Sequence, residues 1–201
     1  MRKREGTYHD ELYDKMWKTK GARFNAYERL RRKHQLSTYA TSFVSAYLIV
    51  INLLTPFNFH TDLGIEPNTI SFITVALSVV LLAFVILENT AEYNLKGDAF
   101  HNCSKEIGRL FNRLHSLIEQ TNPDEDEIER IANDYADILD KYDNHSPIDY
   151  AVHKTKHKND FDLNLIQREW IKFNANYLVH SHYILMIIGP PICVIIWWFN
   201  K

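Results

Sequence analysis

Three long runs of residues without a charge constrain this chain more than any other feature. They cover residues 36–54, 70–87 and 183–199 and contain 19, 18 and 17 residues. A helix of the first length is about 28 Å long, and the hydrocarbon core of a bilayer is about 30 Å thick. Buried helices of a soluble protein reach similar lengths, but they usually carry a polar stripe with charges. We therefore predict an all-α integral membrane protein with a transmembrane helical hairpin and a third, C-terminal transmembrane helix.

Basic residues are distributed unevenly around these runs. Residues 1–35 contain 11 Lys and Arg, the connector 55–69 contains none, and residues 88–182 contain another 11. Cytoplasmic segments of membrane proteins carry the excess of basic residues. The distribution predicts a multi-pass protein with a cytoplasmic N-terminus: a cytoplasmic helical arm over 1–35, a transmembrane hairpin over 36–87, and a cytoplasmic helical region over 88–182. The connector lies outside.

The polar parts of the chain show the spacing of amphipathic helices. The arm has an apolar stripe and no proline before the first run, which is compatible with one long helix through arm and span. Two stronger stripes on either side of Pro123 predict an antiparallel cytoplasmic helical hairpin. Residues 144–159 are polar and are expected to form a loop with a single helical turn. A last stripe is expected to continue into the third run; it consists of Leu163, Ile166, Trp170, Phe173 and Tyr177.

Composition and motifs favour few kinds of chemistry. A net charge of −2 without a basic excess argues against direct nucleic-acid binding. The six glycines form no nucleotide-binding motif, no hydrolase signature is present, and two distant cysteines form no metal site. We therefore expect no enzyme activity, no catalytic residue and no cofactor. His153 and His157 have the spacing of a helical metal pair, which leaves an integral-membrane hydrolase as an alternative, but a histidine among lysines is more often simply solvated.

Polar residues inside the predicted spans are the most informative candidates, because a polar group in the bilayer core needs a hydrogen-bond partner. They recur on one face of each span: Thr38, Thr41, Ser42, Ser45 and Asn52 on the first, and Ser71, Thr74 and Ser78 on the second. Continued by the same steps, the second face reaches Glu88 and Glu92, which would lie at the cytoplasmic mouth of the span. Such faces commonly serve helix packing. Arranged around a water-filled path in several copies, they would line a pore whose carboxylates favour cations. The spacing favours packing and leaves pore lining open.

Two stretches of sequence, together with the order of the spans, resemble a known family. They are MWKTKGARFNAYERLRRKH (residues 16–34), which runs into the first span, and YDNHSPIDY (residues 142–150). The layout is similar to the SLATT family, the two-span effector domains found beside SMODS nucleotidyltransferases, SLOG proteins and, in some subfamilies, reverse transcriptases in bacterial conflict systems. The resemblance covers about residues 8–160 and is weakest for the third span.

The resemblance implies an effector of antiviral defence that acts by abortive infection. Such a protein would reside in the bacterial inner membrane and stay inactive until a partner sensor or signal-generating enzyme, of the reverse transcriptase or nucleotidyltransferase type, is activated. It would then form a homo-oligomeric pore in the lipid bilayer and depolarise the infected cell. The alternative is a membrane-anchored adaptor whose cytoplasmic hairpin docks a partner enzyme without forming a pore.

Overall fold

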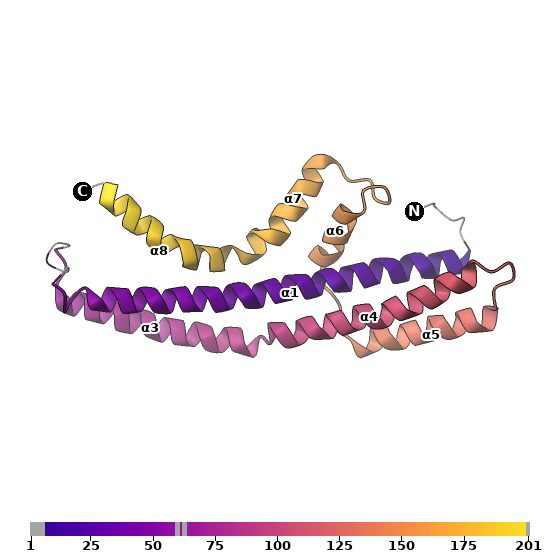
Figure 1. The fold of residues 1–201 in the computed structure, drawn as a ribbon, viewed down its shortest axis with the longest axis horizontal. Coiled ribbons are helices and arrows are strands. Elements are labelled where there is room, and N and C mark those ends of the chain that lie inside the picture. The colour runs from indigo at the N-terminus through magenta and orange to yellow at the C-terminus, as the bar shows by residue number, and fades with distance from the viewer. Residues whose placement is uncertain (1–6, 59–60, 62–63, 200–201) are drawn as a thin grey trace. The chain divides into compact units, whose positions relative to one another are not determined.

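The computed structural model describes residues 7–58, 61 and 64–199, and within them every regular element is a helix. This confirms the predicted all-α class (Figure 1). The helices are α1 (Tyr8–Leu53), α3 (Pro67–Thr90), α4 (Tyr93–Ile118), α5 (Glu125–Lys141), α6 (Pro147–Lys156), α7 (Leu165–Asn176) and α8 (Ser181–Phe199), with a 3₁₀ turn, η1 (Leu178–His180), before α8.

Helix α1 is continuous over 46 residues, so the arm and the first span do form one helix. The chain nevertheless folds into two compact units. One, here called the bundle unit, comprises the described residues up to 31 together with 94–179. The other, the span unit, comprises the described residues of 32–93 and of 180–201. Helix α1 therefore contributes its first half to one unit and its second half to the other.

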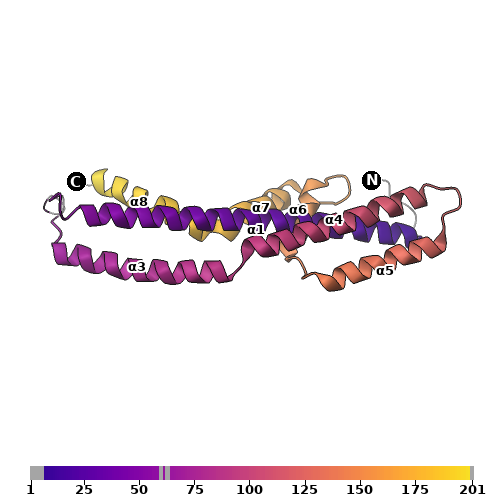
Figure 2. The same cartoon turned by 60° about the horizontal axis from the view of Figure 1, so that its bottom comes forward.

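The bundle unit is built around three helices rather than two. Helices α4 and α5 form the predicted antiparallel hairpin, and the first half of α1 lies alongside them (Figure 2). Asp124 caps α5 by accepting hydrogen bonds from the backbone N–H groups of Asp126 and Glu127, at 3.1 and 3.3 Å. The core combines apolar side chains of all three helices: Leu12, Met16, Cys103, Ile107, Phe111, Leu114, Ile128, Ile131 and Tyr135.

The expected loop at 144–159 contains a ten-residue helix, α6. Ser146 and Asp149 form a capping box at its start, and Pro147 occupies the first turn, where its missing N–H costs nothing. Apolar periodicity underestimated this helix because its buried side chains, Asp149, His153 and Thr155, are polar. The capping box is the signal that would have identified it.

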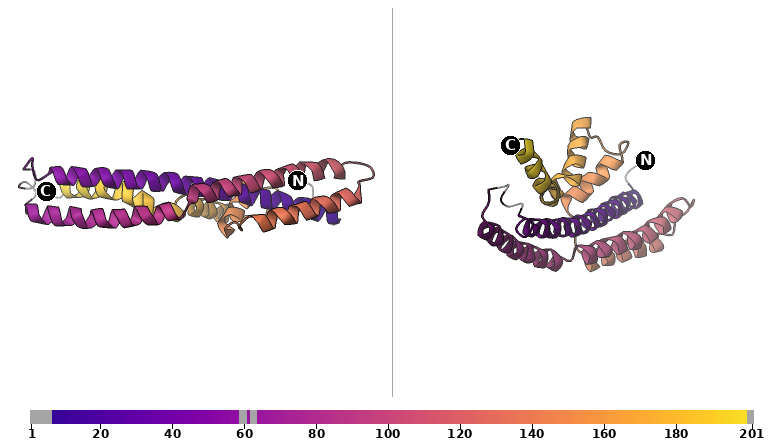
Figure 3. Two further views of the ribbon diagram at one scale, coloured as in Figure 1. Left: turned by 90° about the horizontal axis from the view of Figure 1, so that it is seen from below. Right: turned by 60° about the vertical axis from the view of Figure 1, so that its left-hand side comes forward.

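The span unit contains the second half of α1, α3 and α8. The views from below and from the side show α3 running alongside α1 in the opposite direction (Figure 3). All three helices are long and apolar enough to cross a membrane. Most of their apolar side chains are exposed, as expected where lipid surrounds a helix. Pro190 and Pro191 lie within α8 without ending it, which membrane-spanning helices tolerate.

Helix α8 does not simply continue the preceding amphipathic stripe. Helix α7 ends at Asn176, and η1 separates it from α8. The stripe and the third span are thus two helices joined by a short turn, whereas the spacing predicted one.

Candidate functional site

Hydroxyl groups of the first span bond to the helix that carries them. Thr38, Ser42 and Ser45 donate to the carbonyl oxygens four residues earlier, at distances of 3.0, 2.8 and 2.8 Å. Thr41 donates in the same way to the carbonyl of Ser37, at 3.0 Å. Each hydroxyl is therefore satisfied without water and without a second helix. The side chains of Thr38, Ser42 and Ser45 remain exposed on the surface of the single chain.

The second span repeats this pattern and adds a contact between helices. Ser71 and Ser78 donate to the carbonyls of Pro67 and Thr74, at 3.0 and 2.7 Å. The hydroxyl of buried Thr74 lies 3.1 Å from Oδ1 of Asn52 on the first span. Asn52, Thr74 and Ser78 border one surface depression of about 300 Å³. The structure thus brings these three predicted residues together.

Glu88 and Glu92 do not share a helix face, contrary to the sequence prediction. Helix α3 ends at Thr90, and Glu92 lies in the turn before α4 with a φ of 52°, in the left-handed region. Helical spacing therefore stops before Glu92. Glu88 instead accepts a hydrogen bond from the hydroxyl of Tyr183 on α8, at 2.5 Å. The sequence did not reveal Tyr183 as a partner of Glu88, because an aromatic residue at the start of an apolar run is typical of a membrane boundary.

Helix α8 makes a second polar contact within the span unit. The hydroxyl of Tyr47 on α1 donates to the backbone carbonyl of Ile187 on α8, at 2.8 Å. The third predicted span is thereby bonded to α1 through Tyr47 and to α3 through Glu88. A hydrogen bond between helices in a bilayer typically contributes about 0.6 kcal/mol.

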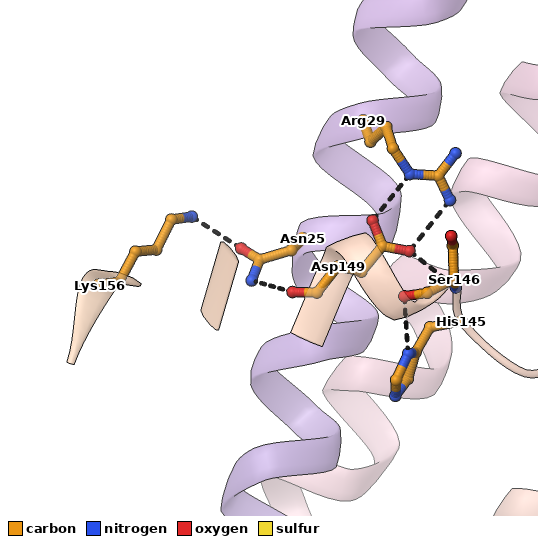
Figure 4. A network of polar contacts seen from close by, with 6 residues as sticks. All are labelled: Asn25, Arg29, His145, Ser146, Asp149 and Lys156. Atoms are coloured by element: carbon orange, nitrogen blue, oxygen red, sulfur yellow. Dashed lines mark hydrogen bonds and ion pairs between the residues drawn. The ribbon is translucent and has the colours of Figure 1, made fainter. Parts of the chain in front are cut away.

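In the bundle unit, polar side chains attach α6 to α1 (Figure 4). Nε and Nη2 of Arg29 donate to the two carboxylate oxygens of Asp149, at 2.8 and 3.0 Å. The same carboxylate accepts the backbone N–H of Ser146, at 2.9 Å, and Asp149 is only 1% exposed. Asn25 donates to the backbone carbonyl of Asp149 and accepts from Lys156, at 2.9 and 2.7 Å. We call this set of residues, Asn25, Arg29, Ser146, Asp149 and Lys156, the α1–α6 network.

The network joins the two stretches that carry the family resemblance. Asn25 and Arg29 belong to residues 16–34, and Ser146 and Asp149 belong to residues 142–150. The buried guanidinium of Arg23 adds a contact between the same stretches, because its Nη2 donates to Oδ1 of Asn144 at 3.3 Å. Nothing in the sequence of either stretch indicates that the two meet, since their contact spans about 120 positions of the chain.

His153 on α6 and His157, which directly follows this helix, are part of an aromatic cluster. His153 is buried, its ring centroid lies 4.4 Å from that of His157, and both rings contact Trp17 edge-on. Burial, followed by the positive charges of His157, Lys156 and Lys18, lowers the pKa of His153 to about 4. Gly21 faces this ring so closely that an added Cβ would overlap it. In the described part of the chain, no three His, Cys, Asp or Glu residues are placed to hold a metal ion.

Helices long enough to cross a bilayer, joined to a compact helical bundle, define a multi-pass membrane protein of the all-α class. The model of the SMODS and SLOG-associating 2TM effector domain family 5 matches residues 5–197, and the chain belongs to this family. The match extends beyond the resemblance at 8–160 and includes α7 and nearly all of α8. No curated protein and no solved structure matches the chain.

Proposed function

We propose that this protein is a membrane effector of a bacterial antiviral, abortive-infection system. In this proposal the chain assembles into a homo-oligomeric pore that depolarises the inner membrane when a partner sensor is activated. The observation that carries the proposal is the exposure of the polar face of the first span. Thr38, Ser42, Ser45 and Asn52 lie on the surface of the single chain. A polar face in the membrane is better accommodated against another copy or against water than against lipid.

The orientation is part of this proposal. The arm and residues 88–182 are cytoplasmic, because each holds 11 basic residues whereas the connector 55–69 holds none. The bundle unit would then meet the activating partner inside the cell. The family description, an effector domain associating with SMODS and SLOG proteins, supports a partner of the signal-generating kind. A nucleotidyltransferase or reverse transcriptase next to its gene would fit. The chain itself would contribute no enzymatic step.

A membrane-anchored adaptor is the second candidate function. The hydroxyls of Thr38, Ser42 and Ser45 already bond to their own helix, so none of them needs a water-filled path. In an adaptor, the same face would only pack helices, and the bundle unit would dock an enzyme.

Crosslinking in membranes tests the assembly. A cysteine replacing Ser45 should form disulfide-linked dimers between copies, because the polar face would lie at the contact. A cysteine replacing Val50, which is 59% exposed and lies on the other side of α1, is the matched control and should not. Equal crosslinking at both positions would contradict an interface at the polar face.

Ion flux separates the pore from the adaptor. The full chain in liposomes under an applied potassium potential should release potassium once Ser45→Cys dimers are locked. Added to the Ser45→Cys chain, Ser42→Leu should lower the flux at least tenfold by filling the path, and Val50→Leu added to the same chain should leave it unchanged. Locked oligomers without flux would favour the adaptor.

A further inference from the structure

Helix α7 carries an apolar face that the described residues of the bundle unit leave exposed. Every residue of α7 is at least partly exposed, whereas α4 and α5 bury most of their apolar stripes in the core. The exposed side chains lie on one side of the helix, with exposed fractions of 72% for Leu165, 82% for Ile166, 59% for Trp170, 47% for Phe173 and 55% for Tyr177. Four of these five residues, Leu165, Ile166, Trp170 and Phe173, also border a shallow groove of about 470 Å³. Large contiguous apolar faces on a protein surface usually contact another protein or a membrane.

The position of α7 in the chain limits what that surface is. Only residues 177–180 separate the end of α7 from the start of α8. Four residues span at most about 14 Å when fully extended. The apolar exposure also continues through Leu178 into the membrane-spanning helix itself, where Leu185 is 71% exposed. Exposed apolar side chains thus occur on both sides of the short connection 177–180, on α7 and on the span α8.

We propose that α7 is an interfacial helix that lies on the bilayer surface beside the start of α8. Its face of Leu165, Ile166, Trp170, Phe173 and Tyr177 contacts the boundary between headgroups and acyl chains. Aromatic residues such as Trp and Tyr are enriched at this depth of a membrane, and short amphipathic helices bind there through their apolar face. The inference concerns the membrane contact alone and does not depend on pore formation.

The charged residues of α7 are compatible with this position. Glu169 borders the same groove as Leu165 and Phe173, which lie one turn before and one turn after it, and Nζ of Lys172 donates to its carboxylate at 2.7 Å. Arg168 lies next to it, with Nε 3.9 Å from the same carboxylate. The two cations exceed the single anion by one charge, which suits a layer of anionic lipid headgroups. The carboxylate of Glu169 is paired with Lys172, and at the depth of the headgroups it would remain hydrated.

Site-specific fluorescence in liposomes of the full chain tests the proposal. A bimane label is placed at Phe173→Cys in a Cys193→Ser background; Cys103 is buried and is left in place. The water-facing control carries the label at Lys105→Cys, on the exposed side of α4. The lipid-facing control carries it at the native, exposed Cys193 of α8. We expect the label at 173 to be quenched by lipids with a spin label near the headgroup. Its quenching by aqueous iodide should be at least fivefold weaker than at 105.

Two outcomes would overturn the proposal. Iodide quenching at 173 as strong as at 105 would mean that the face is in water. Protection from iodide without quenching by lipid, together with disulfide dimers of Phe173→Cys, would show that a second copy covers α7 instead. A Trp170→Ser/Phe173→Ser variant provides a readout without a label, since its bundle unit should keep its proteolysis pattern while the linker 177–180 becomes more sensitive to protease.

Discussion

The two units of this chain hold their helices together in opposite ways. In the bundle unit, charged and amide side chains reach from one helix to another, as Arg29 does to Asp149 and Lys156 to Asn25. In the span unit, hydroxyls such as those of Ser42 and Ser45 bond to their own helix, and among the described residues contacts of Tyr47 and Asn52 join two helices.

The difference follows from the solvent that each unit is built for. In water, a charged or amide side chain stays hydrated until it meets a partner on another helix, whereas short hydroxyl side chains such as Thr19 and Thr155 bond to their own helix there too. In lipid a hydroxyl has no water as an alternative partner, so the nearest backbone carbonyl satisfies it, and charged pairs between helices are costly. The bundle unit is therefore fixed by specific pairs whose loss should be costly. The helix contacts of the span unit should each contribute little, so its arrangement is easier to change.

The largest expected effect comes from breaking the α1–α6 network. The Asp149→Asn variant leaves the guanidinium of Arg29 without its carboxylate, and removing one partner of a buried ion pair costs about 3 kcal/mol. Hydrogen exchange should show faster exchange of the α6 amides, at residues 147–156, and little change in α5. Glu169→Gln removes an exposed pair of α7 and is the control. An unchanged exchange rate in α6 would show that the network is not what holds this helix.

His153 gives a pH dependence of intermediate size. Its pKa of about 4 lies below the ordinary value of 6.5, because burial and then the charges of His157, Lys156 and Lys18 disfavour the protonated form and only Asp160 favours it. The unfolded chain therefore binds more protons between these values, and stability should fall as the pH is lowered from about 6.5 to about 4. Proteolysis of the α6 segment at pH 7 and pH 5 measures this.

The matched variant for that experiment is His153→Phe, which keeps an aromatic ring beside Trp17. Its proteolysis rate should depend less on pH over the same interval than that of the unsubstituted chain. An identical pH dependence in both proteins would assign the effect to another group.

The smallest effect is expected in the span unit. Thr74→Val removes the hydroxyl that meets Asn52 between two spans, and such contacts contribute about 0.6 kcal/mol. Ser71→Ala is the control, because Ser71 bonds only within its own helix. Unfolding by sodium dodecyl sulfate, followed by circular dichroism, should show a small shift for Thr74→Val and none for Ser71→Ala. A shift above about 2 kcal/mol would place this contact outside the range for membrane helices and remove the contrast between the units.

Hydrophobic pattern predicted most of the helices, whereas the family resemblance also needed the two stretches 16–34 and 142–150. Uncharged runs predicted the three candidate spans, and the stripes on either side of Pro123 predicted the α4–α5 hairpin. Both depend on local periodicity, which the sequence displays directly. The helix α1 was predicted, but its packing against α4 and α5 as the third core helix was not. Nothing local in the sequence shows that Leu12 and Met16 pack against residues about a hundred positions away.

The site was harder to predict than the fold. The polar residues of the spans can be found in the sequence, but which of them meet depends on helix rotation; Asn52, Thr74 and Ser78 border one depression. Glu92 was misplaced because helical spacing was extended across the break between α3 and α4, where Glu92 has a left-handed backbone conformation. The α1–α6 network was missed because its buried members, Asn25 and Asp149, are polar, whereas burial is usually inferred from apolar residues.

Gly21 has a consequence for how relatives of this chain can vary. Glycine within a helix costs about 1 kcal/mol relative to alanine, yet here the ring of His153 occupies the space that a side chain would need. Alanine at this position would therefore be accepted only where the residue at 153 is small. Positions 21 and 153 should therefore covary among homologous sequences. A bulky residue at 153 should exclude any side chain at 21, and a side chain at 21 should require a small residue at 153. An alignment in which alanine or a larger residue at 21 commonly occurs together with an aromatic ring at 153 would show that α6 docks differently in those proteins.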